Sequence, residues 1–394
     1  MLGNLCYSNG NFADELVKSG VADRLVRLLS NDDQEIKEWC VSNLWNLCAC
    51  NSACKRIDEL GAIPLMFETL KTTNYKLLQQ SLLGAMNAMS TEHNCREKLL
   101  QLGILDILPK FYQMKENEEI LKHSLNLVVS LMETKPNEAI LTFERFKKSG
   151  IIISILDLLD DVRESIQDRV FNAVAAFSFF ISQEELGLFD HPSLLKKIIS
   201  GMKSSSAISR VCSSGILLNI SFDFNQMREK VVQLGAIPLL LDLLFDSADG
   251  CKDNAAACLT NLVIQNESLC LSLIEMGVPI PVLYTCVTIS EDKAFKSALQ
   301  LLRNLSIFDT VNALQSKLIN LREDGNVWKV LSNCKYVRMF KHLEKIGFNA
   351  NKVSTAHFEV FKATLILNPT LESILLQLFK GKWTTELHKY YPSW

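Results

Sequence analysis

The sequence predicts an all-α solenoid in which similar helical units stack on one another, and three observations lead to this fold class. A motif centred on asparagine returns every 41 to 48 residues. A glycine turn returns in phase with it. The segments between these markers carry apolar residues at i, i+3, i+4 and i+7, which is typical of amphipathic helices. One such unit cannot bury its apolar face alone, so neighbouring units must share a continuous core.

The asparagine motif defines the longest helix of each unit. The asparagine has an apolar residue two places before it and another directly after it, and it stands at Asn4, Asn46, Asn87, Asn219, Asn261 and Asn304. Ser130 and Ser178 are weaker members of the series and fill the interval between Asn87 and Asn219. Because the intervals are so even, the motif indicates an internal repeat rather than chance.

The glycine turn separates two shorter helices that precede the long one. It stands at Gly20, Gly61, Gly103, Gly150, Gly235 and Gly277. Glycine suits the end of a helix, and the proline that follows at Pro64 and Pro238 suits the start of the next. Each unit is therefore predicted to contain a short helix, a glycine turn, a second helix, a polar loop and a third helix that carries the asparagine.

The Leu-Gly-Ala-Ile-Pro turn and the Leu-x-Asn-Leu motif resemble the armadillo repeat family over roughly residues 1–310. A period near 42 residues fits this family and not the 34-residue tetratricopeptide repeat. The resemblance implies a right-handed armadillo-type α-solenoid of about seven three-helix repeats. We place the units at residues 1–8 (third helix only), 9–51, 52–92, 93–135, 136–183, 184–224, 225–265 and 266–309.

The two ends of the chain depart from this pattern. Residues 310–394 lose the markers but contain amphipathic segments at 327–346, 356–367 and 371–379. We expect a degenerate helical cap there, with a separate function as the alternative. At the other end, Met1 falls inside a third helix, so the sequence is either a fragment or shortened form, or another surface covers that edge.

Composition excludes several classes of protein. The 41 Lys and Arg residues nearly balance the 44 Asp and Glu residues, and the net charge of −3 argues against a basic nucleic-acid-binding protein. No run of 18 apolar residues predicts a membrane span, and the first residues do not resemble a secretory signal. Twelve cysteines lie within apolar helical patterns, which indicates a reducing compartment. We expect a cytoplasmic protein, with the nucleus as a second location.

No catalytic chemistry is predicted. The six histidines have no metal-binding or catalytic spacing, and neither a nucleophile-elbow motif nor a phosphate-binding glycine loop is present. One cysteine cluster leaves two interpretations open. Its members are Cys48, Cys50 and Cys54, with Cys40 before them, and they are either core and loop residues or a redox or metal site. We expect no enzyme activity, no cofactor and no metal.

The third helices carry the predicted binding surface. Stacked third helices lie about 8–10 Å apart on the concave face. An asparagine amide both donates and accepts hydrogen bonds, so a row of asparagines suits the backbone of an extended peptide. The armadillo resemblance implies this role for Asn46, Asn87, Asn219, Asn261 and Asn304, with Gln300 and Arg303 beside the last of these. A purely structural role for each asparagine is the alternative.

Three functions remain open at this stage. The first is a non-catalytic scaffold or adaptor that binds a protein or an extended peptide, without nucleic acid and without an integral membrane segment. The second is a regulator of a small GTPase, because the segments around Asn4 and Asn304 are similar to GDP-dissociation stimulators. The third is a nuclear import receptor of the importin-alpha kind. That group carries a tryptophan one turn before the asparagine, whereas this chain has Ser42, Leu83, Gly215, Ala257 and Gln300.

Overall fold

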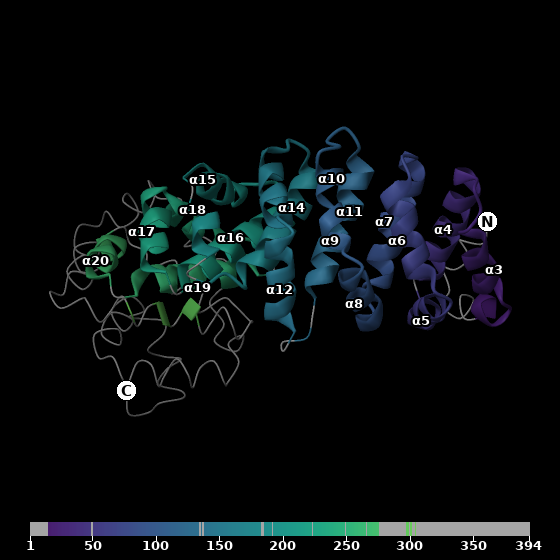
Figure 1. Ribbon diagram of the computed structural model, residues 1–394. Helices are drawn as coiled ribbons and strands as arrows, with labels where there is room; N and C mark the ends of the chain where they lie inside the picture. Colours follow the sequence, from purple (N-terminus) through teal and green to yellow (C-terminus); the bar gives the residue numbers. More distant parts are fainter. Residues whose placement is uncertain are drawn as a thin grey trace, which may run out of the picture. The chain divides into compact units, whose positions relative to one another are not determined.

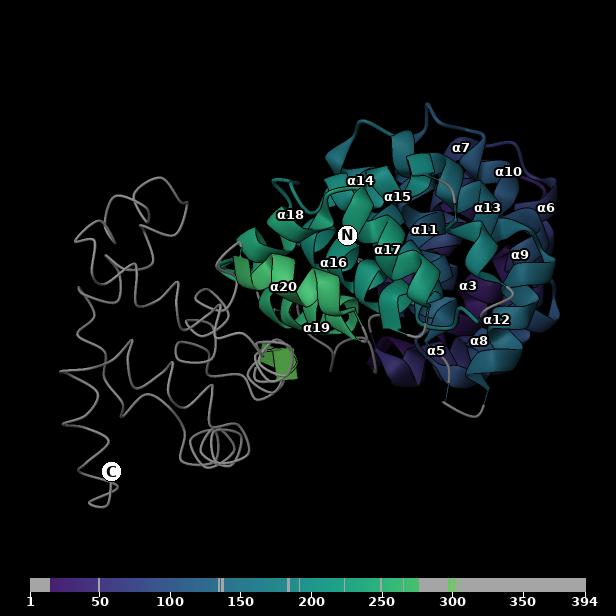
Figure 2. The ribbon, with the colours of Figure 1, turned by 90° about the vertical axis from the view of Figure 1, so that its left-hand side faces the viewer.

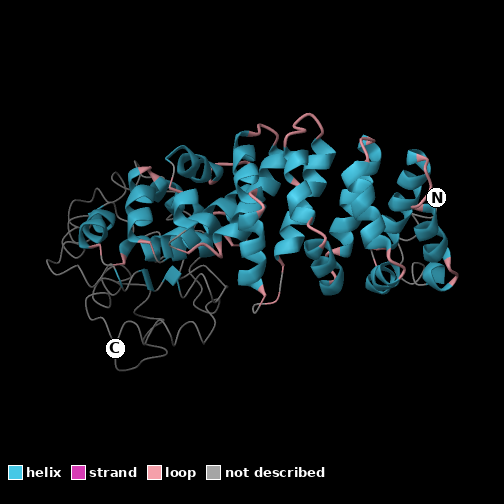
Figure 3. Ribbon diagram, in the orientation of Figure 1, coloured by secondary structure: helices cyan, strands magenta, loops and turns pink. Residues whose placement is uncertain are grey.

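The structure is a computed structural model that describes residues 15–48, 50–133, 135, 138–182, 185–190, 192–222, 224–248, 250–264, 266–275, 297, 298, 300, 301 and 304. All regular structure in these residues is helical, with no strand among them (Figure 3). The chain divides into two compact units, residues 1–189 and 190–394. The predicted all-α class and the armadillo-type architecture are confirmed. The partial repeat predicted at residues 1–8 and the cap predicted at 310–394 lie outside the described residues.

The first unit is a stack of three-helix repeats (Figure 1). Its elements are α3 (Val21–Leu28), α4 (Gln34–Leu47), α5 (Asn51–Glu59), α6 (Ala62–Thr72), α7 (Lys76–Met89), α8 (His93–Gln101), α9 (Ile104–Ile107), α10 (Pro109–Tyr112), α11 (Glu118–Met132), α12 (Ala139–Lys148), α13 (Ile151–Leu156), the 3-10 turn η1 (Asp157–Asp160), α14 (Glu164–Ser178) and the 3-10 turn η2 (Glu185–Leu188). The third helices α4, α7, α11 and α14 pack side by side in that order.

The second unit repeats this arrangement (Figure 2). Its elements are α15 (Pro192–Gly201), α16 (Ala207–Phe222), α17 (Asn225–Gln233), α18 (Ala236–Leu243), α19 (Cys251–Val263) and α20 (Glu267–Glu275). The third helix α16 packs on the third helix α19, and α17 and α18 each contact α19. Within each unit, a repeat thus buries the apolar faces of its helices against those of the next repeat, as a solenoid must.

The glycine turns form as the sequence predicts. Gly20, Gly61, Gly103, Gly150 and Gly235 all have φ between 71° and 82°, in the left-handed region. Each ends one short helix and begins the next. Only glycine occupies this region without a steric penalty from Cβ, which explains why the marker is so regular. Gly277 lies outside the described residues.

The core is built from a repeated position on the third helices. The asparagine row has Ser130 in place of asparagine in α11 and, as shown below, Ala176 in α14. The residue two places before each row position is fully buried: Leu44, Ala85, Val128, Val174, Leu217 and Leu259 are all 0% exposed. Most of the described cysteines are buried among these residues, as expected. Burial raises the pKa of the Cys95 and Cys258 thiols to about 12, so both stay protonated at neutral pH.

Ion pairs join successive repeats at a position that the sequence analysis did not identify. The basic residue five places before a turn glycine contacts a carboxylate of the repeat before it. The pairs are Arg56–Asp23 at 2.8 Å, Lys98–Asp58 at 2.7 Å, Arg145–Glu97 at 3.2 Å, and Lys230–Asp190. Because these side chains are partly exposed, each pair stabilises the fold by less than about 1 kcal/mol. Their regular placement helps to fix the register between repeats.

Candidate functional site

Two row asparagines of the first unit lie together on the third-helix face. Asn46 of α4 and Asn87 of α7 occupy equivalent places on packed helices, and both are partly exposed. Within the described residues, the Asn46 amide makes no hydrogen bond to the rest of the protein. The Asn87 Oδ1 atom accepts a hydrogen bond of 2.9 Å from the Ser130 hydroxyl of α11. This face therefore presents side-chain amides that still have donors to offer.

The structure corrects the position of the row in α14. Ser178 is 3% exposed, and its hydroxyl donates to the Ala175 carbonyl at 2.8 Å. The Ser221 hydroxyl of α16 makes the equivalent contact with the Leu218 carbonyl, at 3.0 Å, so Ser178 corresponds to Ser221. Because Ser221 follows the row asparagine Asn219 by two residues, the row position of α14 lies two residues before Ser178. Ser178 is therefore a core residue, and Ala176 occupies the row position. The sequence misplaced it because aromatic residues stand on both sides of Ser178 and hide the register.

Two asparagines that the sequence analysis missed lie one helical turn earlier. Asn126 stands four residues before Ser130, and Asn172 stands four residues before Ala176. Residues at i and i+4 share a helix face. Asn172 is exposed and Asn126 partly exposed, and neither amide has a hydrogen-bond partner in the part of the chain that the structure describes. The signal in the sequence that could have identified both residues is an asparagine four residues before the row position of a third helix.

An indole ring crosses this face. Three ring atoms of Trp45 lie only 2.7 to 2.8 Å from where a Cβ would stand at Gly84 of α7. The same ring meets the imidazole of His123 on α11 edge-on, with centroids 4.9 Å apart. Trp45 therefore reaches from α4 across α7 to α11. Gly84 is the residue that makes room for it.

The surroundings of the His123 imidazole favour its uncharged form. Burial lowers the pKa of its imidazole below the ordinary value. The Glu119 carboxylate opposes this shift, while the Arg169 guanidinium and the Lys122 ammonium group add to it. The same surroundings favour an edge-on contact of Trp45 with the neutral imidazole ring.

The charged groups around the row have mixed signs. Lys122 contacts Glu118 at 2.6 Å and Glu119 at 2.9 Å, and Glu118 also accepts a hydrogen bond of 2.6 Å from Ser165 of α14. Trp39, just before the middle of α4, is 67% exposed. The face thus offers amides and aromatic surface rather than a strip of one charge.

One row asparagine of the second unit, Asn261, is buried, unlike those of the first unit. Asn261 of α19 is 6% exposed, and its Nδ2 atom donates to the Leu218 carbonyl of α16 at 3.3 Å. This contact joins neighbouring third helices, which favours the structural alternative at Asn261. Asn219 is partly exposed. Asn304 accepts a hydrogen bond of 2.8 Å from Gln300, and Arg303 lies outside the described residues.

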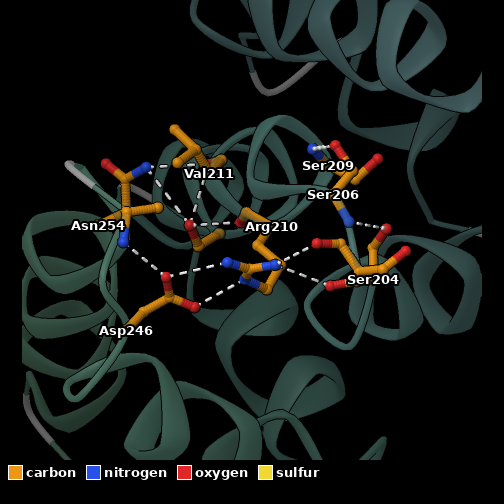
Figure 4. A network of polar contacts seen from close by, with 10 residues as sticks. Ser204, Ser206, Ser209, Arg210, Val211, Asp246 and Asn254 are labelled. Carbon is orange, nitrogen blue, oxygen red and sulfur yellow. Dashed lines mark hydrogen bonds and ion pairs between the residues drawn. The ribbon is translucent and has the colours of Figure 1, made fainter. Parts of the chain in front are cut away.

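A polar network fixes the loops before α16 and α19 (Figure 4). The Arg210 guanidinium donates to both carboxylate oxygens of Asp246, at 2.6 and 3.1 Å, and to the carbonyls of Ser204 and Ser205, both at 2.9 Å. Burial would raise the pKa of Asp246, but hydrogen bonds from Arg210 and from a backbone N–H outweigh it and hold this pKa below its ordinary value. All these groups satisfy one another, so the network is structural.

The cysteine cluster is part of the core and its adjoining loop. Cys40, Cys48 and Cys54 are buried, and the Cys54 thiol donates to the Cys48 carbonyl at 3.3 Å. Cys50 is partly exposed and lies 3.0 Å from the Ser52 hydroxyl. The described residues hold no group of three histidine, cysteine or acidic side chains suited to a metal ion. None of their helices is both long enough and apolar enough to cross a membrane.

Comparison with known proteins agrees with this architecture. The Armadillo/beta-catenin-like repeat family matches residues 224–264. Importin subunit alpha-3 of Arabidopsis thaliana is 23% identical over 240 residues, which is 59% of this chain and 43% of that protein. The chain thus spans less than half the length of this relative.

Two solved structures show the same fold. One comes from work on a conserved phosphorylation switch that controls the interaction between cadherin and beta-catenin. It aligns with a TM-score of 0.66 and 16% identity over 81% of this chain and 58% of that one. The other is a designed armadillo repeat protein in complex with the peptide (KR)4, with a TM-score of 0.53 and 19% identity over 61% of this chain and 98% of that one. The repeated markers, the stacked helices and these likenesses together identify the chain as an armadillo-repeat protein.

Proposed function

We propose that this protein is a non-catalytic interaction scaffold that binds an extended segment of a partner protein on the third-helix face of the first unit. The observation that carries the proposal is the placement of Asn46 and Asn87 at equivalent, partly exposed positions of packed helices, with the Asn46 amide unpaired within the described residues. The designed armadillo protein that holds the peptide (KR)4 supports the same kind of ligand.

The chemistry of such binding is backbone capture. Each amide donates to a carbonyl and accepts from an N–H of the partner, and these groups occur in every peptide whatever its sequence. Selectivity then comes from neighbours such as Trp39, whose exposed ring can act as an anchor. Asn219 and Asn304, with Gln300 and Arg303, are the corresponding candidates in the second unit. Asn261 contributes to stability instead.

The test uses the full chain and a displayed library of random peptides. Selected peptides are measured against wild type, Asn46→Ala/Asn87→Ala and the control Asn94→Ala, which removes an exposed asparagine from α8. Each lost hydrogen bond weakens binding by roughly fivefold, so we expect a loss of roughly twentyfold in the double variant and none in the control. Equal affinities for all three proteins, at equal helix content, would refute the proposal.

Two other functions have specific tests. The importin relative makes nuclear transport the second candidate, although the first unit carries Ser42, Leu83, Asn126 and Asn172 one turn before the row and no tryptophan there. Location in cytoplasm and nucleus is proposed on the same ground, and imaging of the tagged chain tests it. Regulation of a small GTPase requires a partner whose affinity changes between its GDP and GTP forms, which a binding assay with both nucleotides measures.

A further inference from the structure

We infer that the bound segment crosses the first unit obliquely, over Asn46 and Asn87 and then over Asn126 and Asn172, one turn nearer the start of α11 and α14. This inference rests on the proposed function and adds the path and two contact residues. Three observations carry it: the register of the third helices, the hydrogen-bonding state of the polar side chains, and the direction of the Trp45 ring.

The register follows from burial. The buried residues of α11 and α14 correspond one for one, in the pairs Ser124/Val170, Leu125/Phe171, Leu127/Ala173, Val128/Val174 and Leu131/Phe177. With this register Asn126 and Asn172 occupy the same place on neighbouring helices, just as Asn46 and Asn87 do on the two before. The row thus continues through all four helices with a single step of four residues, which is about 6 Å along the helix axis.

Hydrogen bonding explains why the path must take this step. At the unshifted position α14 carries Ala176, which has no polar side-chain atom, and α11 carries Ser130, whose hydroxyl already donates to Asn87. One turn earlier, the amides of Asn126 and Asn172 are accessible and unpaired within the described residues. A peptide that stayed on the unshifted line would meet no polar side chain in α14 and only the acceptor oxygen of Ser130 in α11.

The Trp45 ring runs in the same oblique sense. Trp45, Gly84 and His123 lie one, three and seven residues before the row position of α4, α7 and α11. The contact between them therefore moves toward the start of each successive helix, as the proposed path does. Trp45 and His123 are both partly exposed, so partner side chains can pack against their rings beside the path.

The path sets the length of the segment. Three steps between helices about 9 Å apart, with one shift of about 6 Å, give a path of about 28 Å. An extended chain advances about 3.3 Å per residue, so the segment that touches all four asparagines has roughly eight residues. The partner is therefore an extended segment of this length, recognised mainly through its backbone.

The test measures peptides selected from the random library against four single variants of the full chain. These are Asn46→Ala, Asn87→Ala, Asn126→Ala and Asn172→Ala, with Ser130→Ala and Asn94→Ala as controls. We expect each of the four to weaken binding by roughly fivefold, and by a similar factor for peptides of unrelated sequence. The two controls should bind like wild type, and circular dichroism should show equal helix content throughout.

The outcomes separate this inference from the function on which it rests. If Asn46→Ala and Asn87→Ala weaken binding while Asn126→Ala and Asn172→Ala do not, the oblique path is wrong and the proposed function stands. If none of the four variants weakens binding, or if no peptide is selected, both are wrong. If Ser130→Ala also weakens binding in the first of these cases, the segment follows the unshifted path instead.

Discussion

Replacing Gly84 by alanine should destabilise the protein, although the same change in an ordinary helix interior is stabilising. Gly84 lies inside α7, where alanine is favoured over glycine by about 1 kcal/mol. The added Cβ would stand 2.7 to 2.8 Å from three ring atoms of Trp45, whereas carbon atoms pack at about 3.5–4.0 Å. The ring must therefore move outward by about 1 Å.

The size of the effect follows from what that movement removes. Overpacking of this kind costs about 1–3 kcal/mol, and loss of the edge-on contact between Trp45 and His123 costs about 1 kcal/mol. Subtracting the gain in helix propensity leaves a net destabilisation of about 1–3 kcal/mol. Urea unfolding followed by circular dichroism measures this difference as a lower midpoint at unchanged slope.

A double-mutant cycle with Trp45→Ala makes the test decisive. Without the indole there is nothing for the new methyl group to meet, so Gly84→Ala should then stabilise the protein by about 1 kcal/mol. The coupling energy between the two sites should accordingly be about 2–4 kcal/mol. If Gly84→Ala is stabilising by the same amount in both backgrounds, Trp45 does not lie over Gly84 and the reasoning fails.

The remaining predictions concern stability in the turns, the network and the row. Gly235→Ala should lower the free energy of unfolding by about 1–2 kcal/mol, because φ is 81° there, and a thermal melt would show it. Arg210→Ala should cost about 2–3 kcal/mol, since it strands the partly buried Asp246. Because the pKa of Asp246 is lowered in the folded protein, its ionised carboxylate contributes to folding stability above about pH 4, and this contribution is lost as the pH falls below that. The acid limb of a plot of unfolding free energy against pH should therefore flatten in Arg210→Ala. Asn261→Ala should destabilise by about 1 kcal/mol, whereas Asn46→Ala should change stability by less than about 0.5 kcal/mol; equal losses would contradict the different roles assigned to them.

The sequence by itself determined the fold. The evenly spaced glycines required a left-handed turn in each repeat, and the apolar spacing required helices that could be buried only by stacking. Both signals are local, since a backbone conformation and a helix period are properties of a few consecutive residues. The first pair of the row, Asn46 and Asn87, followed from the same motif.

Tertiary structure decided which polar residues are available to a partner. Asn46 and Asn261 stand in the same sequence motif, yet Asn261 is 6% exposed and donates to a carbonyl of the neighbouring helix, whereas Asn46 is partly exposed. The register of α14, and with it the place of Asn172, became clear only from burial, because Phe177 and Phe179 flank Ser178 symmetrically. The position of Trp45 over Gly84 joins residues of different repeats. Exposure and contact between repeats depend on packing across helices far apart in the chain, which no local pattern encodes.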